Sequence, residues 1–147
     1  MEQRELGTNE IIDRLNGLIN SFSLKDVILL PSVKVTRDDM PCLLVHLGED
    51  VIFKRSSRNE IGYSLQASAW RTLTVIVECW ELSRLNVLTL YKEARKAVLK
   101  DKNGVLINKV TVKEVKADGP FYAAEIDGAY GMRLYLSMNY PDEGPLF

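Results

Sequence analysis

The feature that most constrains this chain is a strong β-strand pattern at residues 70–81. Its sequence reads WRTLTVIVECWE, which is dense in β-branched and aromatic residues. Such side chains favour extended backbone because they pack well on a pleated surface. We therefore expect the middle of the chain to be β-structure.

Weaker strand patterns lie on both sides of this segment. Residues 27–30 are typical of a short strand or a linker, and the acidic pair before Pro41 marks a turn. Gly48-Glu49-Asp50 indicates a tight connection, and Asp118-Gly119-Pro120 indicates another turn. The remaining predicted strands are residues 33–36, 42–47, 51–54, 105–115, 121–126 and 132–140.

The last of these strands alternates with a period of two. Such alternation predicts one buried face and one more polar face. Its two sets are Met132, Leu134, Leu136, Met138 and Tyr140 on one side, and Arg133, Tyr135, Ser137 and Asn139 on the other.

Two segments show helical spacing instead. Residues 8–22 carry apolar side chains every three or four positions, and Thr8 can cap such a helix. Residues 84–100 repeat the pattern, and Asn103-Gly104 supplies a left-handed stop. The apolar positions are Ile11, Ile12, Leu15, Leu18, Ile19 and Phe22 in the first segment, and Val87, Leu90, Ala94 and Val98 in the second.

The order of elements is therefore α-β-β-β-β-α-β-β-β. Short turns join most strands, so we predict an α+β fold with a mostly antiparallel or mixed sheet covered on one face by two helices. The 147 residues correspond to one domain, 1–147, with residues 1–7 and 141–147 as flexible tails.

Composition excludes several classes of protein. The apolar fraction of 46% excludes wholesale disorder, and 19 basic against 20 acidic residues do not support a dedicated nucleic-acid binder. No apolar run is long enough to span a bilayer, and the polar N-terminus lacks the apolar core of a signal peptide. We expect a cytoplasmic protein without a membrane partner, in which Cys42 and Cys79 are buried reduced thiols rather than a structural disulfide.

Catalytic motifs are missing from the sequence, so we predict neither an enzyme nor a cofactor or metal site. The single histidine, His46, lies in an apolar strand on the same side as Cys42. It could act as a general base or metal ligand with Asp38, Asp39 or Cys79. We favour a structural histidine with a satisfied hydrogen bond.

Two polar regions are candidate binding surfaces. Residues 84–102 carry six basic and two acidic residues, and the basic ones at helical spacing form a candidate face for phosphate or an acidic partner, or a solvated face. Residues 54–66 form a long polar loop of the kind that is often functional. The candidate residues are Lys92, Arg95, Lys96 and Lys100 on the helix, and Lys54, Arg55, Arg58, Asn59 and Glu60 in the loop.

This arrangement resembles the bacteriophage tail terminator (tail completion) proteins, the family of the lambda-like minor tail protein U and its Mu-like prophage relatives. The likeness covers residues 8–140: a leading amphipathic helix, a hairpin with a long polar tip, the strand WRTLTVIVECWE, a basic-faced helix and the closing segment AEIDGAYGMRLYLSMNY. It is one of pattern and length, and no single invariant motif carries it.

The resemblance implies a structural, non-enzymatic protein that forms a homo-hexameric ring on the tail tube. Such a ring stops tube polymerisation and offers the head-tail joining surface, so the tail tube protein and the head-tail connector are the implied partners. DNA would pass through the lumen without being read, and the polar loop would face the lumen or a neighbour. The protein would assemble in the bacterial host cytoplasm and end in the virion tail. Open alternatives are another head-tail neck protein, a small cytosolic enzyme or ligand-binding domain, or a weak nucleic-acid binder.

Overall fold

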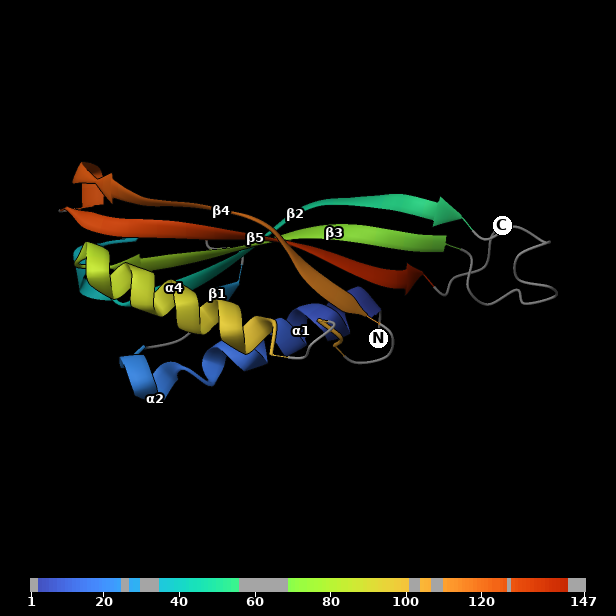
Figure 1. The fold of residues 1–147 in the computed structure, drawn as a ribbon, viewed down its shortest axis with the longest axis horizontal. Coiled ribbons are helices and arrows are strands. Elements are labelled where there is room, and N and C mark those ends of the chain that lie inside the picture. Colours follow the sequence, from blue (N-terminus) through green and yellow to red (C-terminus); the bar gives the residue numbers. More distant parts are fainter. Residues whose placement is uncertain are drawn as a thin grey trace.

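The structure is a computed structural model that describes residues 3–24, 27–29, 35–55, 69–100, 104–106, 110–126 and 128–142. Figure 1 shows one twisted sheet with helices beneath one of its faces. The helices are α1 (Gln3–Asn16), α2 (Ile19–Phe22) and α4 (Arg84–Val98), with 3-10 turns η1 (Arg37–Asp39) and η2 (Ala124–Ile126). The strands are β1 (Val27–Leu29), β2 (Cys42–Arg55), β3 (Ala69–Glu81), β4 (Thr111–Ala123) and β5 (Ala129–Asp142).

The five strands form one sheet in the order β1-β2-β3-β5-β4. Only the β1–β2 pair is parallel, and the other three pairs are antiparallel. The strand with the strongest sequence pattern, β3, lies in the centre and pairs with β5 along its whole length, from Ala69 opposite Asp142 to Glu81 opposite Tyr130. The predicted α+β fold with a largely antiparallel sheet is confirmed.

Alternation along β3 and β5 separates the sheet into two faces. We call the face against which α1 and α4 pack the helix-covered face, and the opposite face the open face. On the helix-covered face the two central strands contribute fully buried apolar side chains, and α4 adds Val87, Leu90, Ala94 and Val98 to the same core. The polar set predicted for β5, from Arg133 to Asn139, lies half-buried on the open face. Both predicted faces of the last strand are confirmed.

Helix α1 lies close against the sheet because it carries a glycine at the contact. A β-carbon on Gly7 would lie 2.7 Å from the Met138 sulfur and 2.9 Å from a methyl group of Val110. The helix begins at Gln3, five residues before the predicted cap at Thr8, and Gly7 and Thr8 are buried within it. The expectation that residues 3–7 form part of a flexible tail is therefore wrong.

Two predicted pairs of short strands are single long strands. The segment Gly48-Glu49-Asp50 is an irregularity within β2, because the pairing with β3 resumes beyond it. Likewise β4 continues through Gly119, where the register with β5 shifts. Glycine and acidic residues that resemble a turn locally are accommodated here as β-bulges, since one partner strand stays continuous.

Smaller differences concern segment ends. The predicted helix at residues 8–22 is broken at Gly17, after which α2 starts at Ile19. The predicted strand at 105–115 begins only at Thr111, and Val105 forms an isolated bridge to it. Gly104 does adopt the left-handed conformation, with φ of +64°. The predicted strand at 33–36 is absent at Val35 and Thr36, and residues 33 and 34 lie outside the described residues.

Candidate functional surfaces

The four basic residues predicted to form one helix face have different surroundings. Arg95 Nε lies 2.6 Å from a carboxylate oxygen of Glu114, and the Tyr91 hydroxyl donates to the other oxygen at 3.1 Å. These bonds tie α4 to β4 and raise the pKa of Arg95, chiefly through the hydrogen bond to Glu114. Arg95 thus takes part in a contact within the molecule, and the four-residue binding face remains a prediction.

Lys92 and Lys96 also lie exposed on α4. Lys96 Nζ is 3.6 Å from Glu93, and three quarters of its side chain is exposed. Lys92 is also exposed and forms no ion pair with any residue that the structure describes. These two lysines remain available for a partner.

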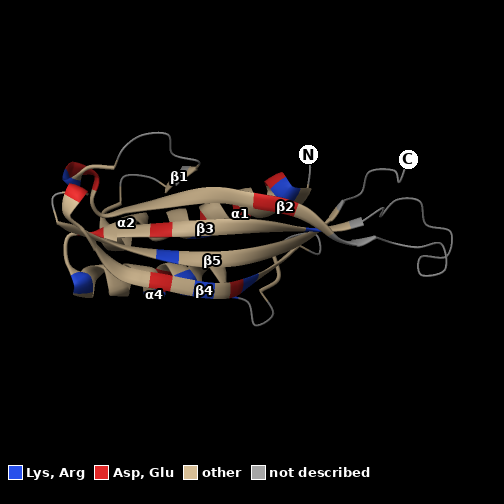
Figure 2. Ribbon diagram, turned by 90° about the horizontal axis from the view of Figure 1, so that it is seen from above, with Lys and Arg blue, Asp and Glu red and all other residues tan. Residues whose placement is uncertain are grey.

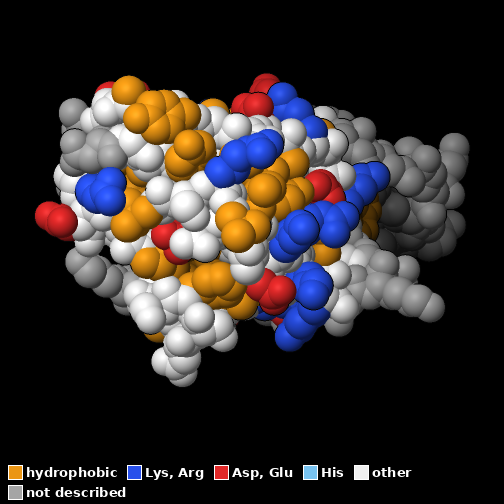
Figure 3. Space-filling model, turned by 60° about the vertical axis from the view of Figure 1, so that its left-hand side comes forward, with side chains coloured by type: hydrophobic (Ala, Val, Ile, Leu, Met, Phe, Trp, Pro, Cys, Tyr) orange, Lys and Arg blue, Asp and Glu red, His pale blue; other side chains and the backbone are white. Residues whose placement is uncertain are grey.

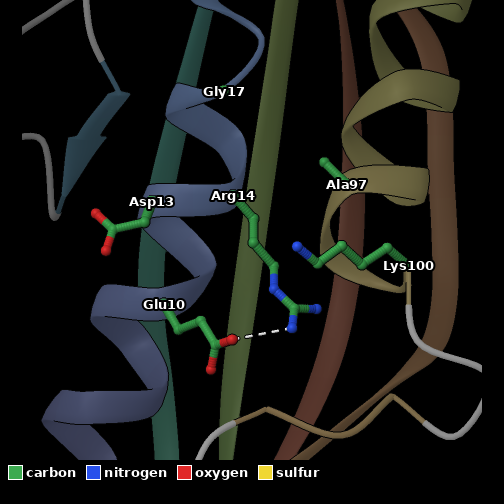
Figure 4. A pocket seen from close by; sticks show the side chains of 6 residues that line it. All are labelled: Glu10, Asp13, Arg14, Gly17, Ala97 and Lys100. Carbon is green, nitrogen blue, oxygen red and sulfur yellow. Dashed lines mark hydrogen bonds and ion pairs between the residues drawn. The ribbon is translucent and has the colours of Figure 1, made fainter.

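Lys100 follows the end of α4 and lines an open groove between α1 and α4. The groove has a volume of about 420 Å³ and is lined by Glu10, Asp13, Arg14, Gly17, Ala97 and Lys100. In Figure 4 the Glu10 and Arg14 side chains lie between the helices, whereas the Asp13 carboxylate points away from α4.

Arg14 uses this position to join the two helices. Its guanidinium donates to the Val98 carbonyl at 2.9 Å and to Glu10 at 2.9 Å. A cation on the terminal carbonyls of a helix is favourable because those carbonyls lack intrahelical partners and carry the negative end of the helix dipole. Within the groove, Arg14 therefore links α1 to the end of α4, with Glu10 as its second partner.

A charged cluster that the sequence did not indicate lies on the open face. The Glu78 carboxylate accepts hydrogen bonds from Trp80 Nε1 at 2.7 Å and from Arg133 Nε at 3.2 Å. The His46 Nε2 atom lies 3.3 Å from the same carboxylate. The guanidinium of Arg133 also lies over the Phe121 ring, 4.8 Å from its centre. Strands β2, β3, β4 and β5 are thus linked through neighbouring side chains.

His46 lies beside Glu78 and on the opposite face from Cys79, one of the partners considered from the sequence. Cys79 lies in the core of the helix-covered face, whereas His46 shares the open face with Glu78. His46 Nε2 is buried and has no hydrogen-bond partner among the described residues, so the hydrogen bond expected for this histidine is not made at Nε2. The short distance to a carboxylate makes an electrostatic contact when the imidazole is protonated.

Both cysteines are free and buried. They point to opposite faces, since Cys42 belongs to a small open-face cluster with Leu44 and Trp80 while Cys79 is in the main core. Burial, with neighbouring carboxylates, raises the pKa of the Cys42 thiol to about 12, and burial also raises that of Cys79. The thiols therefore stay protonated, as buried cysteines do, and the prediction of reduced thiols is confirmed.

The predicted polar loop begins later than expected. The backbone of Lys54 and Arg55 forms the end of β2, paired with Trp70 and Ala69. Arg58, Asn59 and Glu60 lie outside the described residues. Of the predicted flexible tail 141–147, residues 141 and 142 form the paired end of β5, so the prediction is wrong there, and residues 143–147 lie outside the described residues.

Comparison with known proteins identifies no relative. No protein-family model matches the chain, and no curated protein matches it at a significant level.

Among the described residues, no group of three His, Cys, Asp or Glu side chains is arranged to hold a metal ion. No helix within the described ranges is long and apolar enough to cross a membrane.

Proposed function

We propose that this chain is a structural protein of the phage tail terminator type. It caps the tail tube as a homo-hexameric ring, stops tube polymerisation and provides the surface that joins tail to head. The proposal starts from the resemblance in element order, which extends from the leading helix to the closing β-segment. It assigns the protein no catalytic activity.

The observation that carries the proposal is the long hairpin of β2 and β3. The two strands have 14 and 13 residues and pair from Cys42–Trp80 to Arg55–Ala69. β5 pairs with β3 along its whole length, so the hairpin has a three-stranded base. In Figure 1 the paired ends of these strands at Arg55 and Ala69 extend away from the start of α4. A rigid support for a polar tip suits a subunit that must reach a neighbour or a ring lumen.

The partners follow from this role. The ring would contact the tail tube protein on one side and the head-tail connector on the other. DNA would pass through the lumen without base-specific contact, in keeping with a net charge of −1 and the absence of a basic excess. Assembly would take place in the host cytoplasm, and the finished protein would reside in the virion tail.

The experiment is to determine the absolute mass of the purified chain across a concentration series by light scattering after size exclusion. Imaging of the peak by negative stain should accompany it. A closed ring is the expected result, because identical subunits in repeated head-to-tail contact form a ring when the rotation between neighbours allows the last subunit to meet the first.

A second experiment tests the role of the tip: residues 56–64 are replaced with a Gly/Ser segment of equal length. This variant should keep the fold but lose ring assembly or tube capping. If it assembles and caps as the wild type does, the hairpin tip has no role in the proposed function.

A further inference from the structure

Several exposed charged side chains on two sides of the molecule have no close ion-pair partner among the described residues, and they differ in sign from one side to the other. The α4–β4 flank comprises Arg84, Leu85, Lys92, Lys96, Val115 and Tyr122. The α1–β2 flank comprises Glu5, Asp13, Leu29, Glu49, Val51 and Ile52. All twelve side chains are exposed.

The two flanks lie toward opposite edges of the sheet, not on its two faces. β2 and β4 are separated by β3 and β5, and Figure 2 shows them along opposite sides of the ribbon. Arg95 joins α4 to β4 through Glu114, and Arg4 at the start of α1 lies 3.5 Å from Asp50 of β2. Asp13 points away from α4 (Figure 4). Arg4 therefore places the start of α1 toward β2, and Arg95 places α4 toward β4.

The charges of the two flanks have opposite sign. On the α4–β4 flank Arg84 and Lys92 form no ion pair with a described residue, and Lys96 has only the 3.6 Å contact with Glu93. The acidic groups Glu114 and Asp118 on this side are within 4.0 Å of Arg95 and Arg133 respectively.

On the α1–β2 flank the unpaired groups are carboxylates. Glu5, Asp13 and Glu49 are exposed and form no ion pair with a described residue. The nearby cation Arg4 is already engaged with Asp50.

Both flanks also expose large apolar side chains. Leu85 is 73% and Val115 62% exposed on one flank, while Leu29, Val51 and Ile52 are each about 40% exposed on the other. Figure 3 shows, from the end at which α4 begins, hydrophobic side chains interspersed with those of Lys and Arg. Apolar contacts surrounded by charged groups are the usual composition of a protein–protein interface.

We propose that the α4–β4 flank of one copy docks on the α1–β2 flank of the next copy, which makes the ring contact heterologous. This inference rests on the proposed ring and specifies its contact. A two-fold contact between identical flanks would bring like charges together, which is costly, whereas the head-to-tail arrangement places Lys and Arg opposite Glu and Asp. The charges then set the orientation, and the apolar side chains supply buried surface.

The test uses charge reversal on each flank of the full chain. One variant carries Lys92→Glu with Lys96→Glu, so both of its flanks are negative; the other carries Asp13→Lys with Glu49→Lys, so both are positive. Each alone should lose the wild-type oligomer, with its apparent dissociation constant raised at least tenfold in light scattering. Lys100→Glu and Glu125→Lys are the matched controls, because these exposed residues lie outside both flanks, and they should assemble as the wild type does.

Mixing the two defective variants in equal amounts should restore the oligomer. Each contact in the mixture then joins a negative flank to a positive one, and a ring with an even number of subunits closes by alternation. Circular dichroism of each variant checks that it is folded. If each reversal leaves the wild-type oligomer intact, or if the mixture is not restored while the controls assemble, the flank assignment is overturned although the ring stands. A wild type that never assembles would overturn the proposed function itself.

Discussion

The two faces of the sheet are built from the same strands but have different chemistry. Along β3 and β5 the side chains on the helix-covered face, such as Val77 and Leu134, are apolar and completely buried. The open-face residues between them pair polar groups across strands, as in Thr72–Asn139 at 2.8 Å and Glu78–Arg133 at 3.2 Å. The buried apolar contacts that stabilise the fold are therefore concentrated on the helix-covered face. On the open face, polar side chains of neighbouring strands pair with one another without a helix above them.

The largest expected effect comes from a cavity on the helix-covered face. Leu134→Ala removes a completely buried side chain between the sheet and the helices. It should lower the free energy of unfolding by about 2–5 kcal/mol, measured by urea denaturation. The control on the same strand, Ser137→Ala on the open face, should change it by less than about 0.5 kcal/mol. Similar losses for both would contradict the division between the faces.

The next effect tests how closely α1 approaches the sheet. Gly7→Ala places a methyl group 2.7 Å from the Met138 sulfur, so side chains or the helix must shift. Overpacking of this kind costs about 1–3 kcal/mol, and the gain of about 1 kcal/mol for alanine over glycine inside a helix offsets part of it, so we expect a smaller net loss in thermal or urea unfolding. Asn9→Ala, at an exposed position of the same helix, is the control and should be nearly neutral. A Gly7→Ala variant that is more stable than the wild type by about 1 kcal/mol, the full gain of alanine over glycine inside a helix, would mean that the helix is not held at the described distance.

A smaller effect is expected from the charged cluster on the open face. Glu78→Ala leaves the indole N–H of Trp80 and the guanidinium of Arg133 without this acceptor. The cost should be about 1 kcal/mol, because an unpaired polar group in a partly buried site is unfavourable. Glu78→Gln keeps an acceptor for Trp80 and should recover part of the loss. If Glu78→Ala is as stable as the wild type, the charged cluster does not contribute to folding stability.

The smallest effect is a loss of stability at alkaline pH. Burial and the hydrogen bond with Asp50 raise the pKa of Tyr140 from 10.0 to about 12 in the folded protein. A raised pKa means that the neutral form is favoured by folding, so this contribution is complete below pH 10 and is lost between pH 10 and 12. Burial of Cys42 acts in the same direction from pH 9 upward.

The melting temperature should therefore fall as pH rises above 9. Tyr140→Phe should fall less steeply than the wild type between pH 10 and 12, although it loses the bond to Asp50 at every pH. Melting followed by circular dichroism from pH 8 to 11.5 measures both slopes. Parallel curves for the two proteins would show that Tyr140 does not contribute.

The sequence predicted those parts of the fold that depend on local periodicity. Alternation in the last strand identified which side of β5 is buried, and helical spacing identified the core positions of α4. The continuity of β2 past Gly48 could not be predicted, because it depends on pairing with β3, a segment about 25 residues away along the chain. A bulge and a turn use the same residue types, and only the partner strand decides between them.

The candidate surfaces were less predictable for the same reason. Helical spacing placed Lys92 and Arg95 together, but the carboxylate that engages Arg95 comes from β4. The cluster around Glu78 draws His46 from β2 and Arg133 from β5, so it requires the strand order and not only the pattern of each strand. The one available signal was Glu78 itself, an acidic residue within a strand otherwise rich in apolar side chains.

The measurement that tests the central claim most directly is the absolute mass of the wild-type chain by light scattering, with images of the same peak. The account predicts a discrete species of about six times the 16.7 kDa chain mass, visible as rings. A species that stays at the mass of one chain over the whole soluble concentration range, with no rings in the images, would contradict it.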